Sequence, residues 1–253
     1  MNDLFDLTGK KAVVTGAGRG LGKDIAVGLA KAGADVMLWS RTLAELEETA
    51  ALVRAEGRQA WVRTIDITDI KRTAELAEEA AETLGRVDIL VNNAGTNKPQ
   101  PTAEVDEDTW DMLMNINLKG AFFCAQAFGK IMIRQGGGKI INVSSQAGKL
   151  ALFNRAVYCA SKGAIDQITR VMAYEWAEHG VTVNAVAPTF VETKMTEAQL
   201  RNKEFRDYLF SKLRLPRLAK ASEVTAGVLY LASPGADIVT GHILYIDGGW
   251  TIH

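Results

Sequence analysis

Tyr158 and Lys162 place a phenol and an ammonium group four residues apart in the stretch Tyr158-Cys-Ala-Ser-Lys162. Side chains at this spacing share one face of a helix. A free phenol has a pKa of about 10, and a cation a few ångströms away stabilises the phenolate and lowers that value. A phenol tuned toward neutrality can donate or accept a proton. The pair is therefore a candidate general acid and base; the alternative is two surface side chains of a helix.

Two polar side chains elsewhere in the chain are candidates for the same site. The stretch Ile141-Asn-Val-Ser-Ser145 ends a predicted strand, and in a parallel sheet the carboxyl ends of the strands share the edge where ligands bind. A serine hydroxyl at that edge could hold a substrate oxygen. Asn117 falls inside a predicted helix, where asparagine has a low propensity. It either caps or bends that helix or holds a water molecule, and the sequence leaves these possibilities open.

A glycine-rich turn lies near the start of the chain, where Thr15-Gly-Ala-Gly-Arg-Gly-Leu-Gly22 follows a predicted strand and leads into a predicted helix. Glycines allow a tight turn, and the helix N-terminus offers free N–H groups to a pyrophosphate. The pattern is T-G-x-x-x-G-x-G rather than G-x-G-x-x-G, because Leu21 takes the sixth position from Gly16. The turn favours a dinucleotide site; the alternative is a purely structural connection.

The choice of dinucleotide depends on the end of the second predicted strand. An acidic residue there normally binds the hydroxyls of the adenosine ribose. This chain has Ser40 and Arg41 instead, and no acid occurs before Glu45 in the next helix. A hydroxyl and a guanidinium suit a 2′-phosphate, and Arg19 could add a second cation. We therefore expect NADP(H) to be favoured, with NAD(H) possible.

Short apolar runs alternate with longer amphipathic stretches along the whole chain. Strict alternation of about seven strands and six helices predicts an α/β fold with one doubly wound, Rossmann-type parallel sheet and helices on both faces. We expect residues 1–253 to form a single domain. The predicted strands are 11–15, 35–39, 60–65, 87–91, 139–143, 181–186 and 242–246, and the predicted helices are 21–32, 42–56, 70–84, 110–135, 156–179 and 222–232.

Residues 189–221 break this alternation, since they are rich in charge and only weakly periodic. A long irregular insertion is often a lid or a binding loop. We expect a substrate lid here; the alternative is a pair of peripheral helices.

Composition excludes several classes of partner. The 253 residues carry a net charge of −1, so nothing indicates binding to nucleic acid or an anionic membrane. No apolar run reaches the length of a membrane span, and the acidic start does not look like a secretion signal, so we expect a cytoplasmic protein. Cys124 and Cys159 have no partners at metal-ligand spacing, so no metal site is expected.

Taken together, these residues resemble the short-chain dehydrogenase/reductase family over nearly the whole chain. Ser145 rather than Ser144 matches the family's serine, because it precedes Tyr158 by thirteen positions (158 − 145). One departure is Pro188-Thr189, where the family commonly has Pro-Gly, since threonine tolerates fewer φ values than glycine. The motifs that carry the resemblance are Thr15–Gly22, Asp66, Asn92–Gly95, Asn117, Ser145, Tyr158–Lys162 and Pro188–Thr193.

The resemblance implies a role for each catalytic candidate. Tyr158 would be the acid and base, Lys162 would lower its pKa and bind the nicotinamide ribose, and Ser145 would orient the substrate oxygen. Asn117 would hold a water molecule that relays protons through Lys162. The nicotinamide would do the hydride chemistry.

The resemblance also implies a cofactor site. Asp66 and the Ile67 backbone would meet the adenine, Asn93 would lie near its ribose, and Thr193 would contact the nicotinamide carboxamide. With the candidates from the glycine turn and the second strand, the expected cofactor-binding residues are Gly16, Gly18, Arg19, Gly20, Leu21, Ser40, Arg41, Asp66, Ile67, Asn93, Ala94, Gly95, Tyr158, Lys162, Pro188, Val191 and Thr193.

For the substrate, the chain resembles a subgroup that acts on sugar acids, the gluconate 5-dehydrogenase and 2-deoxy-gluconate 3-dehydrogenase group. This predicts interconversion of a secondary alcohol and a ketone on a sugar acid or polyol, and Lys98 or Arg155 could pair with a substrate carboxylate. The alternatives are a 3-oxoacyl-carrier-protein reductase and a non-catalytic dinucleotide-binding regulator. The family also implies a homotetramer. The substrate candidates are Ser145, Gln146, Arg155, Tyr158 and Lys98.

Overall fold

A single parallel sheet of seven strands runs through the computed structural model, which describes residues 2–192 and 200–252. The strand order is β3-β2-β1-β4-β5-β6-β7, so the order reverses between β1 and β4. A ligand crevice forms outside the carboxyl ends of the strands at such a reversal. The strands are β1 Lys11–Thr15, β2 Asp35–Ser40, β3 Ala60–Thr64, β4 Ile89–Asn92, β5 Gly138–Val143, β6 Val181–Pro188 and β7 Ile243–Ile246.

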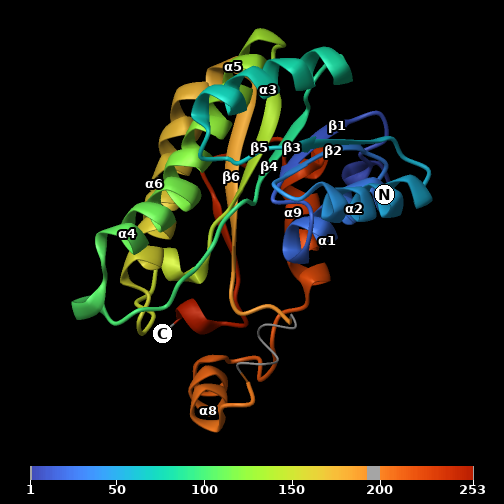
Figure 1. Ribbon diagram of the computed structural model, residues 1–253. Coiled ribbons are helices and arrows are strands. Elements are labelled where there is room, and N and C mark those ends of the chain that lie inside the picture. The colour runs from blue at the N-terminus through green and yellow to red at the C-terminus, as the bar shows by residue number, and fades with distance from the viewer. Residues whose placement is uncertain (1, 193–199, 253) are drawn as a thin grey trace.

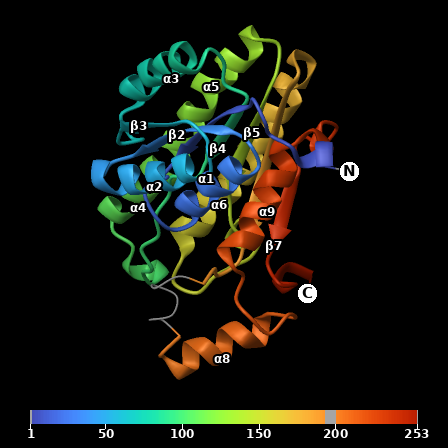
Figure 2. The ribbon, with the colours of Figure 1, turned by 90° about the vertical axis from the view of Figure 1, so that its right-hand side faces the viewer.

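Helices cover both faces of this sheet (Figures 1 and 2). One face carries α1 Gly20–Lys31, α2 Leu43–Ala55 and α9 Ala221–Ala232. The other carries α3 Ile70–Leu84, α5 Ala121–Arg134 and α6 Ala156–Trp176. The doubly wound α/β fold predicted from the alternation of elements is therefore confirmed.

The core is divided by the sheet, because successive side chains of a strand point to opposite faces. On β2, Val36 and Leu38 pack with α1, α2 and α9, whereas Met37 and Trp39 pack with α3, α5 and α6. Trp39 is fully buried, and its ring lies 5.3 Å from that of Phe128. Its bulk therefore serves core packing, although one edge also reaches the cavity described below.

The predicted helix 110–135 is divided into three segments. They are α4 Glu107–Met114, a π-helical segment Asn115–Gly120 and α5. Gly120 fits against the chain after β3, since a Cβ on it would lie 2.8 Å from the Ile67 carbonyl oxygen. Single π-helical turns are rare and occur often at functional sites. Asn117 lies in this π-helical segment, where the regular α-helical pattern is interrupted.

The described part of 189–221 contains one helix, α8 Lys203–Lys212, which lies beyond the carboxyl edge of the sheet beside the C-terminus (Figure 1). Leu209 and Leu213 pack with Leu218 and with Trp250 of the C-terminal segment. Val191 forms an isolated bridge with Ala219. This segment therefore has a small apolar cluster of its own, next to the edge where ligands bind.

Candidate active site

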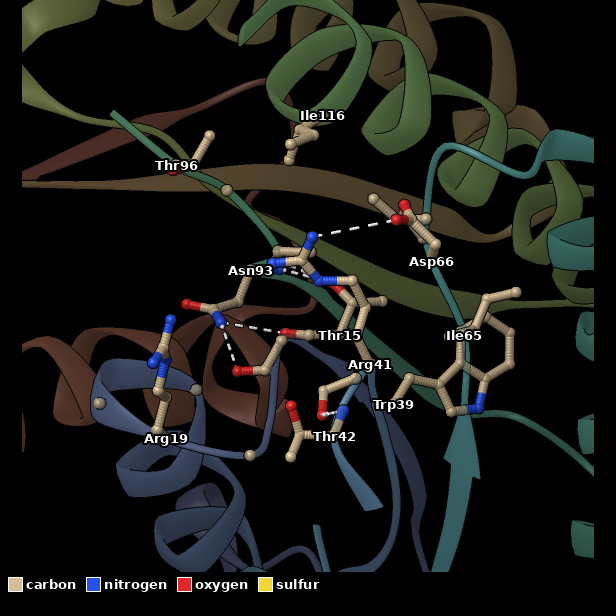
Figure 3. Close-up of a pocket in the computed structure, with 18 of the residues that line it drawn as sticks. Thr15, Arg19, Trp39, Arg41, Thr42, Ile65, Asp66, Asn93, Thr96 and Ile116 are labelled. Atoms are coloured by element: carbon tan, nitrogen blue, oxygen red, sulfur yellow. Dashed lines mark hydrogen bonds and ion pairs between the residues drawn. The ribbon is translucent and has the colours of Figure 1, made fainter. Parts of the chain in front are cut away.

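A cavity of ≈510 Å³ lies at the carboxyl edge of the sheet, where the strand order reverses (Figure 3). Sequence reasoning missed Thr96, Met112 and Ile116 of its wall, which belong to no motif and come from the loop and helices after β4. Of the predicted cofactor residues, those that line it are Gly16, Gly18, Arg19, Gly20, Leu21, Ser40, Arg41, Asp66, Ile67, Asn93, Ala94 and Gly95.

The glycine turn fits a dinucleotide pyrophosphate. Helix α1 begins at Gly20, with no side chain capping its first N–H groups and no acid in its first turn. Gly16 and Gly20 have φ values of +66° and +53°, which side chains rarely tolerate. A Cβ on Gly20 would meet no atom within 4 Å, whereas one on Gly22 would collide with the Gly16 carbonyl oxygen. The turn therefore offers uncapped backbone donors and close approach to an anion.

Two arginines lie at the end of the cavity nearest β2. Arg41 Nη1 is 3.9 Å from Asp66 Oδ2, as the dashed line in Figure 3 shows, and Arg19 Nη1 is 3.8 Å from Glu45 Oε1. Pairs this long and exposed contribute little, so both guanidinium groups can turn to a phosphate. The Asp66 carboxyl accepts hydrogen bonds from Thr68, which lower its pKa against the effect of burial.

Asn93 joins the end of β4 to the glycine turn. Its side-chain amide donates to the carbonyl oxygens of Thr15 and Gly16 at 3.0 and 3.3 Å. The Thr15 hydroxyl in turn accepts the N–H groups of Asn93 and Ala94 at 2.9 and 3.0 Å. The side chain predicted to lie near a ribose thus lines the cavity and also fixes the shape of the turn.

Lys162 and Tyr158 lie together on α6, as their spacing predicts. Lys162 Nζ is 5.7 Å from the centre of the Tyr158 ring and donates to the Val143 carbonyl oxygen at 2.8 Å. Burial lowers the pKa of Lys162 to about 8, and the nearby Asp166 carboxylate opposes that shift. The two side chains that were expected to work as a pair are therefore neighbours in a buried place.

The Tyr158 hydroxyl differs from expectation in its acidity. Burial raises the pKa of Tyr158, and a hydrogen bond with Ser145 acts in the opposite direction. Lys162 does not lower the pKa of Tyr158 as expected, because its ammonium group points to the Val143 carbonyl oxygen and the effect of burial dominates. Ser145 and Tyr158, thirteen positions apart, are nonetheless brought into contact.

Asn117 is buried and tied to the loop after β4. Its Oδ1 accepts the Thr96 N–H at 2.7 Å, and its Nδ2 donates to the Thr96 carbonyl at 2.8 Å and to the Ser161 hydroxyl at 3.3 Å. A Cβ on Gly95 would lie 3.3 Å from Asn117 Oδ1 and 3.7 Å from Lys162 Nζ. Gly95 therefore connects the dinucleotide-sized cavity with the group around Lys162.

The two candidate partners of a substrate carboxylate have different surroundings. Arg155 precedes the first residue of α6, its guanidinium lies 5.7 Å from the centre of the Phe190 ring, and burial lowers its pKa. Tyr158 and Tyr208 of α8 lie close enough to act in the opposite direction on that pKa. Lys98 instead donates to the Thr109 hydroxyl of α4 at 2.7 Å. Of these two candidates, Arg155 is therefore the one that lies near Tyr158.

Gln146, the substrate candidate next to Ser145, is almost fully buried. Only 1% of it is exposed, and its Oε1 has no hydrogen-bond partner in the described part of the chain. A buried acceptor left unpaired costs free energy.

The remaining cofactor candidates follow β6. Pro188 ends that strand opposite Ile246 of β7, and the N–H of Thr189 donates to the Ile246 carbonyl at 3.1 Å. Among residues 2–192 and 200–252, Asn154 is the only non-glycine residue with a positive φ, so the threonine in place of glycine is not strained in that way. Thr193 lies outside the described residues.

Membrane spans, metal ligands and cysteines concern parts of the chain outside the cavity. In the described ranges, no helix is long and apolar enough to cross a membrane. The same ranges hold no group of three His, Cys, Asp or Glu side chains placed to bind a metal ion. Cys124 and Cys159 are both free thiols, and burial raises the pKa of Cys124.

The fold and this site are those of one enzyme class. A sequence profile described as short chain dehydrogenase matches residues 10–204. The chain therefore belongs to the short chain dehydrogenase family, and it is an oxidoreductase that acts on CH–OH groups.

Individual relatives resemble it over their whole length. Gluconate 5-dehydrogenase of Gluconobacter oxydans is 37% identical over 99% of this chain and 98% of its own. Galactitol 2-dehydrogenase of Rhizobium johnstonii is 40% identical, over 98% and 97%. The crystal structure of a gluconate 5-dehydrogenase from Burkholderia cenocepacia in complex with NADP and tartrate superposes with a TM-score of 0.95 at 36% identity, and the match covers 100% of this chain and 99% of that one.

Proposed function

We propose that this chain is an NADP(H)-dependent dehydrogenase that interconverts a secondary alcohol and a ketone on a sugar acid or a polyol. The reaction is R₂CH–OH + NADP⁺ ⇌ R₂C=O + NADPH + H⁺. The observation that carries the proposal is the meeting of Ser145, Tyr158 and Lys162 beside a cavity whose glycine turn fits a dinucleotide. When bound, the nicotinamide would accept or donate the hydride.

The chain's own residues would handle the proton and the substrate oxygen. Tyr158 would take the hydroxyl proton during oxidation and return it during reduction, and Ser145 would hold the same oxygen by hydrogen bonding. Lys162 would stabilise the phenolate once it forms, because an opposite charge nearby favours ionisation. Asn117, held by Thr96, would keep the π-helical segment against the site and position the water that relays the proton.

Selection of NADP(H) would depend on the end of β2. Ser40 and Arg41 line the cavity there, with no acid at the strand end. Arg19 lies nearby, and the ion pairs that the two guanidinium groups would give up are long, at 3.8 and 3.9 Å. Arginine and hydroxyl donors suit a 2′-phosphate, and the related structure that superposes well contains NADP. NAD(H) remains the weaker alternative cofactor.

The substrate class is supported by two further observations. Relatives that match over their whole length act on gluconate and on galactitol. Within the site, Arg155 lies over the Phe190 ring and beside Tyr158, so it could bind a carboxylate at the far end of a substrate whose carbinol meets Tyr158. We therefore propose an acid-bearing sugar derivative as the preferred substrate and a neutral polyol as the second choice.

The surrounding structure is proposed to serve this site. Residues 1–253 would act as a single domain, with 189–221 as a lid that carries Phe190 and Tyr208 over Arg155. We further propose a homotetramer in the cytoplasm, with the apolar surface of the long helices α5 and α6 and the last strand in its interfaces.

Turnover by the purified protein tests the proposal. Gluconate, related sugar acids, polyols and 3-oxoacyl substrates would be assayed with NADP(H) and NAD(H), beside Tyr158→Phe. We expect a sugar acid to be turned over with NADP⁺ and the variant to lose at least about a thousandfold in kcat, within the range for a general acid and base combined with its positioning. Turnover that survives in Tyr158→Phe would overturn the mechanism, and turnover of the 3-oxoacyl substrate alone would replace the substrate class.

A matched pair of substitutions tests the acid group of the substrate. Arg155→Ala should raise KM for a sugar acid by about ten- to a hundredfold, the loss of one or two charge-assisted hydrogen bonds, and leave KM for a neutral polyol within about twofold. Lys98→Ala is the control, because that ammonium is held by Thr109. Equal effects of Arg155→Ala on acidic and neutral substrates would contradict the proposal.

A further inference from the structure

The end of β5 and one face of α6 are joined by three side-chain contacts. The Val143 carbonyl oxygen accepts a hydrogen bond from Lys162, and the Ser144 hydroxyl donates one to Asp166. The Ser145 side chain is hydrogen-bonded to Tyr158. The three helix residues are spaced four apart, so they lie on one face. Two of these contacts involve proposed catalytic residues, and the third is made by Asp166.

Asp166 is a buried carboxylate with one strong hydrogen bond. The Ser144 hydroxyl donates to its Oδ1 at 2.5 Å, and only 4% of the residue is exposed. A Cβ on Gly148 would lie 2.5 Å from Asp166 Oδ2, so the glycine leaves the room that the carboxylate occupies. Ser144 also lies 3.4 Å from the Lys162 carbonyl oxygen, at the limit of a hydrogen bond.

Burying the charged Asp166 carboxylate costs folding free energy. Taking a charged carboxylate out of water costs free energy unless it is paired, and burial raises the pKa of Asp166 accordingly. The Ser144 hydrogen bond and the cations Arg170 and Lys162 counteract this. Of these cations, Arg170 is exposed on the turn after Asp166, and Lys162 is the buried ammonium on the turn before it.

The charge of Asp166 in turn affects the pKa of Lys162. Burial favours the neutral amine of Lys162, and among the described residues the Asp166 carboxylate acts in the opposite direction on its pKa. Loss of that negative charge would therefore leave the ammonium less stable beneath Tyr158. A buried carboxylate one turn from a proposed catalytic lysine thus has a function that packing does not supply.

We propose that Asp166 is a positioning residue whose carboxylate keeps the buried Lys162 side chain protonated and directed at Val143. The proposal rests on the proposed function of Lys162, but it concerns a residue that contacts neither the cofactor cavity nor the reacting atoms. Its carboxylate would act through Lys162, and Ser144 would hold it in place.

Other titratable and charged groups lie around Asp166. Tyr245 of β7 and Asp247, which follows that strand, lie near it, and Lys149 lies 5.3 Å from the centre of the Tyr245 ring. Burial raises the pKa of Tyr245, Asp166 and Asp247 add to that rise, and Arg170 opposes it. Tyr245 is neutral at the pH values of interest, so Lys162 remains the buried cation that responds to Asp166.

Asp166→Asn is the decisive variant, because asparagine keeps the shape and an oxygen that can accept the Ser144 hydrogen bond but removes the charge. Lysine labelled with ¹³C at Cε would be titrated by NMR in wild type and in the variant, with the Lys162 signal assigned from its absence in Lys162→Met. We expect Lys162 to titrate about one pH unit lower in Asp166→Asn, as for loss of an opposite charge nearby. This readout needs no substrate, so it stays informative if the proposed substrate class fails.

The kinetic counterpart is measured in the direction of ketone reduction. Lys162 must carry its proton, so activity should fall as pH rises through its pKa. That alkaline limb should therefore begin about one unit lower in Asp166→Asn. Its melting temperature should fall, because removing one partner of a buried charge pair leaves the Lys162 ammonium without its compensating charge.

Two controls separate charge from shape. Glu175→Gln removes a charge from the exposed side of the same helix and should leave the Lys162 titration within about 0.2 units, since exposed charges several turns away are screened. Ser144→Ala removes the hydrogen bond but keeps the carboxylate, so it should lower the melting temperature without moving the Lys162 titration downward by a full unit. An unchanged Lys162 titration in Asp166→Asn would overturn the proposal and leave Asp166 a packing residue.

Discussion

The Asn117 side chain binds both backbone polar groups of Thr96, accepting the N–H at 2.7 Å and donating to the carbonyl at 2.8 Å. Twenty-one residues separate the two positions along the chain. The contact joins the π-helical segment to the loop that follows β4, and Gly95 of that loop borders both the cavity and Lys162. One amide thereby fixes the distance between the proposed cofactor site and the proposed catalytic group.

Replacing Asn117 should therefore affect stability and catalysis together. Asn117→Ala would leave the partly buried Thr96 N–H and carbonyl without their side-chain partner, at a cost of roughly 1–3 kcal/mol in the free energy of unfolding. We expect kcat to fall by at least tenfold, because the loop beside Lys162 is released. Urea unfolding and steady-state kinetics measure the two effects. Asn115→Ala in the same segment is the control and should change neither by much; equal effects of both variants would contradict a specific role of the amide.

The burial of Lys162 has a consequence for stability that depends on pH. Its pKa is lowered from 10.5 to about 8 in the folded protein. Below pH 8 the ammonium is protonated in both states, so its burial cost is present in full. Between about 8 and 10.5 the unfolded chain binds more protons than the folded one, and the contribution of Lys162 to stability therefore rises with pH.

Lys162→Met removes this titration while keeping the length of the side chain. The free energy of unfolding of wild type minus that of the variant should increase by about 2–3 kcal/mol between pH 7 and 10, at about 1.4 kcal/mol per pKa unit. Urea unfolding across that range measures the difference. Lys130→Met, at an exposed position on α5, is the control for removing a lysine elsewhere on the surface. A free-energy difference for Lys162→Met that does not change with pH would show that the pKa of Lys162 is not lowered in the folded protein.

Arg41 should control the choice of dinucleotide. Arg41→Ala removes a guanidinium that forms a long, 3.9 Å ion pair with Asp66 and could therefore turn to a phosphate. We expect the Kd for NADPH to rise by about tenfold or more, as for loss of a charge-assisted hydrogen bond. The Kd for NADH should stay within about twofold, because NADH has no 2′-phosphate.

Fluorescence titration with both dinucleotides checks this selectivity. Arg72→Ala is the matched control, since that arginine pairs with Glu79 on the surface of α3, away from the cavity. A wild-type protein that binds NADH more tightly than NADPH would contradict the cofactor assignment itself. Parallel losses for both dinucleotides in Arg41→Ala would show that Arg41 binds a part common to both.

Asn154 is expected to set the start of α6 through its backbone. Its φ is +57°, and its carbonyl accepts the Gln100 N–H at 2.8 Å. Asparagine and glycine tolerate this conformation better than alanine. Asn154→Ala should therefore lower the free energy of unfolding by about 1 kcal/mol and raise KM for a sugar acid, because Arg155 follows directly.

Asn154→Gly is the informative comparison, measured by urea unfolding and by KM. It keeps the positive φ and should be close to wild type in both. A loss in the glycine variant as large as in the alanine variant would show that the amide side chain, rather than the backbone conformation, matters at this position.

Much of the fold follows from local pattern. Alternating apolar and amphipathic runs predicted all seven strands to within a few residues, because strands buried on both faces must be continuously apolar. The division of 110–135 was not predictable from that pattern. It depends on Gly120 meeting the Ile67 carbonyl and on Asn117 meeting Thr96, and both partners come from other parts of the chain.

The sequence by itself determined which chemical groups are available and their order. Glycines at 16, 20 and 22, a strand end without an acid at Ser40, and Tyr158 one turn before Lys162 are properties of short stretches. Their local geometry follows from the turn or helix in which they lie, so they could be interpreted without a fold.

Only the tertiary structure decided how those groups behave. Burial in the folded chain raises the pKa of Tyr158, whereas the spacing to Lys162 alone predicted that this pKa would fall. The fold also distinguishes the two candidate partners of a carboxylate, since Arg155 lies near Tyr158 and Lys98 is held by Thr109. It also placed Ser144, from the chain after β5, next to Asp166 and the Lys162 carbonyl oxygen. The reason is that the cost of burying a charge depends on all atoms around it, and those atoms come from strands and loops far apart in the chain.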